Sequence, residues 1–482
     1  MNLGTILRIL GILITLLSVT LIPPMIVAYI FKDSGGLAFI QSFFITLFLG
    51  SILWYRYRHC KTELKTRDGF LIVVLFWTVL SFFGALPFYL SATQDIKLVD
   101  AVFESFSGLT TTGATVLSGL DTMPKAILYY RQQLQWIGGM GIIVLAVAVL
   151  PMLGIGGMQL YKAETPGPVK DSKLTPRIAG TAKALWYIYL ALTVACTLAY
   201  WSAGMSFFDA ISHAYSTIAI GGFSTHDASI GYYDSAMIEG IASVFMLIAG
   251  VNFALHYTAF NSFTLTQYFR DPEFKTYVSI LGITALLCFI VLYASNSFDT
   301  EYSIRHAIFQ AISIGTTAGF TTSNYNLWPA FLPLILLLTS FVGGCAGSTG
   351  GGMKVIRILL LFKQGYREIK KLIHPRAVFV IKLGKQPIDN NIIGAVWGFF
   401  AAYVFMFILI MLVLMADGLD QVTAFSAVAA CMNNLGPGLG DVALSYAGIG
   451  DLSKWVLCFA MLLGRLEIFT LLVLFVPAFW RR

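Results

Sequence analysis

Charged side chains are scarce in this sequence. Only 11% of its 482 residues are Asp, Glu, Lys or Arg, and 57% are hydrophobic, whereas a soluble globular protein carries about a quarter charged residues. This balance excludes an ordinary soluble fold. The apolar runs lack the polar–apolar alternation of membrane-barrel strands, and they recur at lengths of about 20 residues or more, enough to cross a bilayer as helices. The sequence therefore predicts an all-α polytopic membrane protein.

Other signals of chemistry are also missing. The six cysteines are scattered without a CxxC pair or a nearby histidine cluster, which argues against a disulfide framework or a zinc site. Neither an HExxH motif nor a paired aspartate lies in an apolar run, so we expect no intramembrane enzyme. The net charge of +7 resides in linkers between the apolar runs, where it serves as a topology signal rather than a nucleic-acid site.

The apolar runs and the linkers between them predict a topology. Lys and Arg concentrate in alternate linkers, and such residues favour the cytoplasmic side, so both termini are expected inside. No cleavage site follows the first run, which we interpret as a retained helix. The basic positions are residues 55–67, Lys162, Lys170, Lys173, Arg177, Lys183, Arg270, Lys275, 354–385, Arg481 and Arg482. The ten expected spans are 5–31, 37–55, 70–92, 126–154, 182–203, 236–262, 276–296, 329–361, 391–415 and 452–480, the fourth and eighth interrupted by glycines.

Four outer segments, each too short to cross the membrane, share one pattern: an amphipathic helical stretch followed by a polar strip with a glycine. Aligned on Gly113, Gly222, Gly319 and Gly436, the pattern recurs after 109, 97 and 117 residues. A second landmark tests this alignment. It is a pair of residues in the following span, both small in the first three copies, and it begins 25, 27, 24 and 28 residues after the aligned glycines. We therefore predict two N-terminal spans and four parallel helix–pore-loop–helix repeats around a pseudo-fourfold pore. The expected units are residues 1–66, 67–163, 164–270, 271–375 and 376–482.

The strips have the chemistry of a cation site. Glycine adopts backbone angles that other residues avoid, and rings of backbone carbonyls can replace the hydration shell of a potassium ion. The alternative is that the glycines only let helices pack closely. The predicted filter residues, acting through their backbone carbonyls, are Thr111, Thr112, Gly113, Ile220, Gly221, Gly222, Thr317, Ala318, Gly319, Asn434, Leu435 and Gly436.

These strips carry a family resemblance over essentially the whole chain. Residues 110–115, 219–225, 316–322 and 433–438, together with 343–354 and 464–470, resemble the TrkH family, the membrane subunits of bacterial Trk potassium uptake in the Trk/Ktr/HKT superfamily. The resemblance implies a bacterial inner-membrane homodimer with one pore per subunit, carrying K⁺ and Rb⁺. It also implies a cytosolic TrkA-type ring that senses NAD and ATP or ADP, so nucleotides are expected only on that partner, and no covalent cofactor is expected.

Two features of the strips bear on selectivity. In related plant transporters, a serine at the aligned position of the first strip goes with sodium transport. This chain has a glycine there, Gly113, which is the residue associated with potassium transport. Only one glycine per strip is shared by all four copies, so we expect limited discrimination against sodium.

A gate is expected below the filter. The eighth span contains six glycines in ten residues, and each glycine disfavours a helix by about 1 kcal/mol. The segment resembles the intramembrane gating loop of the family; the alternative is a kinked helix end. Its residues are Gly343, Gly344, Cys345, Ala346, Gly347, Ser348, Thr349, Gly350, Gly351 and Gly352. Arg465 lies at the aligned depth in the fourth copy, where we predict that it projects into the pore and repels cations until the loop shifts. The alternative, which can coexist with this role, is a structural arginine that bonds the carbonyls of the loop; Glu467 is not an expected partner.

Three further alternatives stay open at this point. Asn252 and His256 either line the inner pore or form a packed contact between helices. The basic linker 354–385 either docks a cytosolic partner or faces lipid headgroups. A symporter coupled to protons or sodium is the closest rival to a channel, although such transporters commonly use inverted repeats, whereas these repeats are parallel.

Overall fold

The computed structural model describes residues 2–60, 62, 65–91, 96–144, 178–329, 331–384 and 386–481. Within these ranges the only strands are β1 (Lys382–Leu383) and β2 (Gln386–Pro387), which form a short antiparallel hairpin. Helices make up almost all other regular structure, so the predicted all-α class is confirmed. The following predicted features lie outside the described residues: Lys162, Lys170, Lys173, Arg177, Arg482, the ends of the third and fourth spans and the boundary at 163 and 164.

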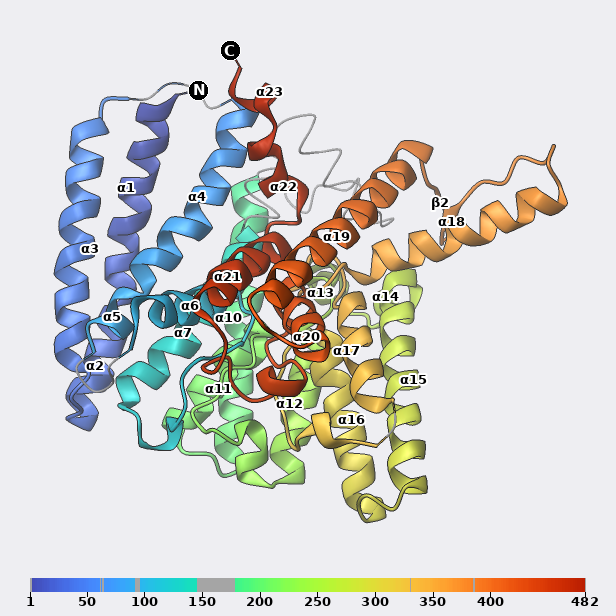
Figure 1. The fold of residues 1–482 in the computed structure, drawn as a ribbon, viewed down its shortest axis with the longest axis horizontal. Coiled ribbons are helices and arrows are strands. Elements are labelled where there is room, and N and C mark those ends of the chain that lie inside the picture. The colour runs from blue at the N-terminus through green and yellow to red at the C-terminus, as the bar shows by residue number, and fades with distance from the viewer. Residues whose placement is uncertain are drawn as a thin grey trace.

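The N-terminal helices lie at one side of the molecule, packed against α4, α5 and α7 of the first repeat (Figure 1). They are α1 (Leu3–Thr20), α2 (Ile22–Phe31) and α3 (Gly36–Tyr57). Where α1 crosses α3, a Cβ on Gly11 would lie 3.0 Å from the carbonyl oxygen of Gly50. Small residues at such a crossing let two membrane helices approach closely.

The rest of the chain repeats one order of elements: a membrane-length helix, a short buried helix, a polar strip and a second helix. The first helices are α4 (Thr66–Gly84), continued by α5 (Leu86–Tyr89), α10 (Ile178–Ser202), α15 (Pro272–Ala294) and α19 (Asn390–Ala416). The short helices are α6 (Leu98–Leu109), α11 (Phe207–Ala219), α16 (Thr300–Thr316) and α20 (Gln421–Met432). The second helices start as α7 (Lys125–Val144), α12 (Ala236–Ala249), α17 (Leu332–Val342) and α21 (Asp451–Arg465).

The second helices are where the sequence-based spans need correction. The predicted sixth span, 236–262, bends by 93° between α12 and α13 (Phe253–Ser262), and the predicted tenth, 452–480, bends by 111° between α21 and the following residues Phe469–Phe475. Each of these two predicted spans is therefore divided into two helical parts by a sharp bend. At the first break Asn252 caps α13 by accepting a hydrogen bond from the Ala254 amide at 2.8 Å, which favours a new helix start.

The predicted glycine interruption of the eighth span is confirmed. Helix α17 ends at Val342, and α18 (Val355–Ile373) begins only after the glycine-rich loop. Six helices in the described ranges are long and apolar enough to cross a membrane, or up to eight if each bent pair is one span. The remaining short segments are α14 (Thr266–Arg270), α22 (Phe469–Leu472), α23 (Pro477–Trp480), η1 (Leu120–Thr122), η3 (Ser229–Tyr233), η4 (Tyr325–Leu327), η5 (Gly440–Val442) and η6 (Val473–Phe475).

The short helices occupy the centre of the molecule. In α20 the small residues Ala424, Ala427 and Ala430 are fully buried, which lets neighbouring elements approach this side of the helix closely. The helix begins where Asp420 accepts hydrogen bonds from the amides of Val422 and Thr423, a capping arrangement that satisfies amides left open at a helix start. Each polar strip therefore comes directly after a short helix that is buried inside the bundle.

Helix α18 leaves this bundle. Figure 1 shows the C-terminal part of α18 and the loop after it extending away from the other helices, whereas Leu383 of β1 is buried in a cluster with Ala346 and Ile356. The apolar side chains of Phe362, Tyr366 and Leu372 are exposed along α18, which also carries Lys363, Lys370 and Lys371. The proposed docking role of residues 354–385, like the proposed unit boundaries, stays a prediction.

Candidate functional site

The four strips share an unusual backbone conformation. In each strip the aligned glycine and the residue two positions before it both have positive φ angles. The non-glycine members are Thr111, Ile220, Thr317 and Asn434, with φ of 53°, 53°, 71° and 52°; the glycines have φ of 84°, 78°, 79° and 100°. Positive φ is uncommon outside glycine and is an outlier for β-branched residues. Such strained conformations persist only where the surroundings enforce them, and they cluster at functional sites.

The strips meet edge to edge in a closed ring. Each aligned glycine faces the carbonyl oxygen of the residue just before the aligned glycine of the next strip, and a Cβ on any of the four would come within 3.0 Å of that oxygen. The pairs are Gly113 with Gly221, Gly222 with Ala318, Gly319 with Leu435, and Gly436 with Thr112. The last pair returns to the first strip. The structure thus brings all four predicted strips together, and only glycine fits at the aligned position.

The ring is connected to the ends of the four short helices. Each strip starts at a helix C-terminus, after Leu109, Ala219, Thr316 or Met432. A helix C-terminus carries a partial negative charge of about half an electron from its open carbonyl groups. Four helix C-termini lie beside this ring, and their partial negative charges favour a cation at the ring.

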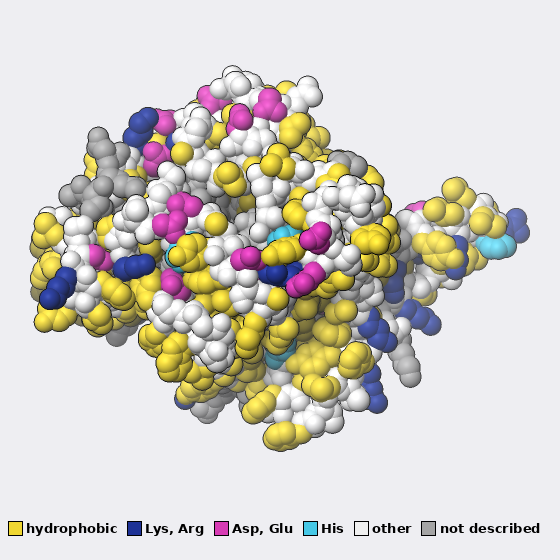
Figure 2. All heavy atoms as spheres, turned by 90° about the horizontal axis from the view of Figure 1, so that it is seen from below, with side chains coloured by type: hydrophobic (Ala, Val, Ile, Leu, Met, Phe, Trp, Pro, Cys, Tyr) yellow, Lys and Arg dark blue, Asp and Glu magenta, His cyan; other side chains and the backbone are white. Residues whose placement is uncertain are grey.

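A cavity of about 80 Å³ lies on one side of the ring. It is lined by the four aligned glycines and by residues that follow the strips, such as Ser224, His226 and Asp227. Figure 2 shows the face of the molecule that carries the segments after the strips, with acidic side chains spread over it. Asp121, Asp227 and Asp441 are exposed there, and their charge favours cations over anions.

A buried ion pair that sequence reasoning missed supports two of the strips. Arg131 on α7 and Glu104 on α6 are 1% and 0% exposed, and their side chains meet at 2.7 Å. Glu104 accepts a hydrogen bond from the Val116 amide at 3.0 Å, while Arg131 donates to the Ser224 carbonyl at 3.0 Å. The pair therefore joins the end of the first strip to the end of the second.

The alignment contains a signal that could have revealed this support. The residue nine positions before the aligned glycine is polar in three copies: Glu104, His213 and Gln310, with Ala427 in the fourth. His213 hydrogen-bonds the Ser224 hydroxyl at 2.9 Å, and Gln310 donates to the Ser323 carbonyl at 3.1 Å. In three repeats the short helix thus holds the chain just beyond its own strip.

Gln135 on α7 forms a second support. Its amide donates to the Gly221 carbonyl at 2.6 Å and accepts from the Phe223 amide at 3.1 Å. The side-chain amide of Gln135 thus bonds one carbonyl and one amide of the second strip, as a peptide group of a neighbouring strand would. Nothing in the spacing of the sequence predicted this contact, because it depends on the packing of α7 behind the strip.

The predicted gating loop lies directly against the strips. The Gly351 amide donates to the Thr317 hydroxyl at 2.7 Å, and the Gly352 amide donates to the Asn433 carbonyl at 3.0 Å. On its other side the Cys345 amide donates to the Gly250 carbonyl at 2.8 Å, at the break between α12 and α13. The loop is an ordered segment held by repeats two, three and four.

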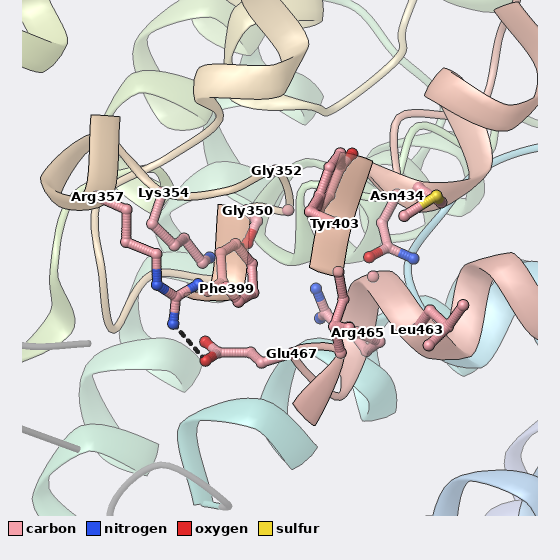
Figure 3. A pocket seen from close by; sticks show the side chains of 14 residues that line it. Gly350, Gly352, Lys354, Arg357, Phe399, Tyr403, Asn434, Leu463, Arg465 and Glu467 are labelled. Atoms are coloured by element: carbon pink, nitrogen blue, oxygen red, sulfur yellow. Dashed lines mark hydrogen bonds and ion pairs between the residues drawn. The ribbon is translucent and has the colours of Figure 1, made fainter. Parts of the chain in front are cut away.

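Arg465 lies beside this loop (Figure 3). Its side chain is 6% exposed and donates one hydrogen bond, to the Thr349 carbonyl at 3.1 Å. Its Nε and second terminal nitrogen have no hydrogen-bond partner in the part of the chain that the structure describes. Arg465 lines a cavity of about 50 Å³ together with Gly350, Gly351 and Asn434. The bond to the loop, which the sequence offered as the alternative role, is present, and the role in the pore stays a prediction.

The charges around Arg465 follow the sequence-based expectation. Glu467 does not pair with Arg465; it meets Arg357 of α18 at 2.5 Å, as the dashed line in Figure 3 marks. Lys354 lines the same cavity and donates to the Gly350 carbonyl. Cationic side chains thus outnumber the one carboxylate in this cavity, which makes it unfavourable for a passing cation.

His226 forms a second charged group, at the cavity on the opposite side of the ring. It contacts Asp121 at 2.5 Å and Asp209 at 3.8 Å, and stacks on Tyr232. Burial alone would lower the pKa of His226, but its interactions with Asp209 and Asp121 outweigh burial and raise it. The hydrogen bond from His226 lowers the pKa of Asp121.

Asn252 and His256, left open by the sequence, form local contacts. Asn252 caps α13, and His256 hydrogen-bonds Tyr268 at 2.8 Å and the Ile248 carbonyl at 2.9 Å. These bonds fit the packed polar contact better than a pore lining.

Membrane-length helices packed around buried polar strips define a multi-pass membrane protein. The family model TrkH, described as a cation transport protein, matches residues 35–482. The chain is 59% and 58% identical to the Trk system potassium uptake proteins TrkH of Vibrio parahaemolyticus and Escherichia coli K12, with 100% of each chain covered. It matches the crystal structure of the potassium transporter TrkH from V. parahaemolyticus with a TM-score of 0.93, at 57% identity and 100% coverage of both chains. The chain belongs to the TrkH family of transport proteins and is not an enzyme.

Proposed function

We propose that this chain is a potassium uptake channel that also passes Rb⁺ and discriminates weakly against Na⁺. Its relatives are named potassium uptake proteins. The observation that carries the proposal is the closed ring of four strips, in which each aligned glycine faces a carbonyl of the next strip. Backbone carbonyls in such rings replace the hydration shell of a cation. The pseudo-fourfold pore predicted from the repeats is part of this proposal.

The proposed filter residues are those predicted from the sequence: in each repeat the residue two positions before the aligned glycine, the residue before it and the glycine itself. The ring contacts support the last two positions, and the positive φ supports the first. The four strips contribute different side chains at the first position, including an isoleucine and an asparagine. Because these side chains differ, the four strips do not position their carbonyls identically around the ring. This supports weak discrimination between K⁺ and Na⁺.

The gate comprises residues 343–352 and Arg465. The loop lies against the third and fourth strips, and the buried guanidinium of Arg465 bonds the Thr349 carbonyl of the loop. A cation leaving the ring on this side meets the positive charges of Arg465 and Lys354. Conduction in this proposal therefore requires the loop to move, and Arg465 opposes cations until it does.

The proposed assembly rests on the family resemblance and on the predicted topology. The chain is proposed to form a homodimer in the bacterial inner membrane, with one pore per subunit and both termini in the cytoplasm. Figure 1 shows the two termini close together at one end of the bundle, which supports a common side. A cytosolic TrkA-type ring that binds ATP or ADP and NAD is the proposed partner, since the relatives belong to systems named Trk. Nucleotides bind that partner rather than this chain.

The filter assignment is tested with two glycine variants of the second repeat. Gly222→Ala introduces a Cβ that overlaps the Ala318 carbonyl, whereas a Cβ on Gly240 of α12 meets nothing within 4 Å. In proteoliposomes with an outward K⁺ gradient, we expect Rb⁺ tracer uptake to be lost in Gly222→Ala and kept in Gly240→Ala. Equal uptake by both variants, at matched protein content, would refute the filter assignment.

A second measurement separates the channel from the symporter. Net potassium flux is measured over a range of membrane potentials at a fixed potassium gradient, with the proton gradient inward, absent or outward. A channel gives the same reversal potential in all three cases, because only the potassium gradient and the voltage drive flux. A reversal potential that moves with the proton gradient establishes the symporter instead.

A further inference from the structure

The loop that contains residues 343–352 is bonded to the ring of strips, not merely placed beside it. The Gly351 amide donates to the Thr317 hydroxyl at 2.7 Å, and the Gly352 amide donates to the Asn433 carbonyl. A Cβ on Gly351 would overlap that same carbonyl, and a Cβ on Gly350 would lie 2.9 Å from the Thr316 carbonyl. Three successive glycines therefore let the backbone of the loop contact the third and fourth strips directly.

Thr317 stands out among these contacts because the bond uses its side chain. Its backbone has a φ of 71°, a conformation that a β-branched residue adopts rarely. Asparagine or glycine would adopt this conformation more easily. Threonine instead supplies a side-chain hydroxyl. Thr317 is fully buried, and its hydroxyl accepts a hydrogen bond from the Gly351 amide. A buried amide left without an acceptor is unfavourable, so this hydroxyl stabilises the observed position of the loop.

The first repeat supplies an internal comparison. Thr111 is the same residue at the aligned position, also with positive φ and also buried. Its hydroxyl has no hydrogen-bond partner among the residues that the structure describes. The two threonines thus share residue type, backbone conformation and place in the ring, and they differ in the contact with the loop.

We propose that Thr317 is a positioning residue that holds the loop to the third strip, so that loop position and strip geometry change together. This inference rests on the proposed function, in which the loop is the gate. When the loop moves, the Thr317 hydroxyl loses its donor and the strip loses a restraint next to the ring. Because coupling between two sites is reciprocal, a change in the third strip also changes the stability of the closed loop.

The test measures hydrogen exchange of the loop in the full-length protein, in lipid nanodiscs without any partner. Thr317→Val removes the acceptor and keeps the shape, Thr317→Ser keeps the hydroxyl, and Thr111→Val is the matched control. We expect exchange of amides in residues 343–352 to be about threefold to tenfold faster in Thr317→Val, as for the loss of one hydrogen bond. Thr317→Ser and Thr111→Val are expected to match the parent chain in this segment. Equal exchange in Thr317→Val and Thr111→Val overturns the inference.

A flux measurement on the same variants separates this inference from the proposed function. Faster loop exchange with increased partner-free Rb⁺ flux in Thr317→Val supports both. Faster exchange with unchanged flux supports the contact between Thr317 and the loop, and counts against the loop as the gate. If Thr317→Val does not fold, Thr317→Cys takes its place, since a thiol is a weak acceptor of similar size.

Discussion

The ion pair between Arg131 and Glu104 allows a quantitative test of how the ring is supported. Replacing Arg131 by Met keeps the length of the side chain and removes its charge. Two unit charges 2.7 Å apart attract by about 6 kcal/mol at an effective dielectric constant of about 20. Burial opposes that attraction, and breaking such a pair from one side typically costs about 3–5 kcal/mol, because an unpaired charge stays buried.

The double variant Arg131→Met with Glu104→Gln should be less damaging than Arg131→Met alone. It removes both charges, and the amide oxygen of the introduced glutamine can still accept the hydrogen bond that the Val116 amide donates to Glu104 in the parent chain. Replacing a buried pair by neutral groups of similar volume is often close to neutral. The four proteins of this cycle isolate the interaction between the two side chains.

The assay is thermal unfolding in detergent, read by loss of the monodisperse peak, together with the ratio of Rb⁺ to Na⁺ flux. We expect the midpoint temperature to fall most in Arg131→Met and to recover partly in the double variant. The flux ratio should move toward one in Arg131→Met, because Arg131 also bonds the Ser224 carbonyl beyond the second strip. The control is Lys97→Met, since Lys97 and Asp451 are 69% and 56% exposed and 3.9 Å apart; such pairs contribute about 1 kcal/mol or less. Equal losses in Arg131→Met and Lys97→Met would refute the reasoning.

Three further outcomes are expected. Arg465→Ala should increase partner-free Rb⁺ flux several-fold in proteoliposomes while Arg465→Lys does so less, because lysine keeps the charge; unchanged flux in Arg465→Ala would remove it from the gate. The contribution of His226 to stability should depend on pH: its pKa is raised in the fold above the ordinary 6.5 and that of Asp121 is lowered, so the pair stabilises the fold between these two values. This stabilisation is lost as pH rises through the raised pKa of His226 or falls through the lowered pKa of Asp121. A difference in unfolding midpoint between the parent and His226→Gln that stays constant from pH 5 to 9 contradicts this. Glu467→Gln should increase mobility of α18, measured by spin labels on its exposed face, whereas Glu368→Gln, at an exposed ion pair within the helix, should not.

The glycine-bearing strips were predictable because their signal is local and recurs in four copies. Gly113 and its three counterparts must be glycine for the ring to close, so spacing alone located them. The positive φ at Thr111 and Thr317 carries no such signal, because threonine at these positions is chosen by contacts rather than by backbone preference. Local sequence reasoning therefore included both positions in the predicted filter but anticipated the unusual backbone angle only at the glycine.

The supporting contacts and the helix breaks depended on tertiary packing. The pair of Glu104 and Arg131 unites residues of two helices that meet only in the folded bundle. The break before α13 leaves the apolar pattern of 236–262 intact, and only Asn252 as a helix cap hints at it. For Arg465 the sequence allowed two roles, and the contact with Thr349 became visible only once the loop was placed.

The ring has a consequence for biosynthesis. Its last contact joins Gly436 to Thr112, and the nearby bond from Asn434 to the Thr112 hydroxyl links positions 322 residues apart. A nascent chain emerging from the ribosome lacks the closing member until its final quarter has been translated. A half-made or truncated product therefore cannot close the ring, and in the proposed channel it would lack the complete coordination shell for an ion.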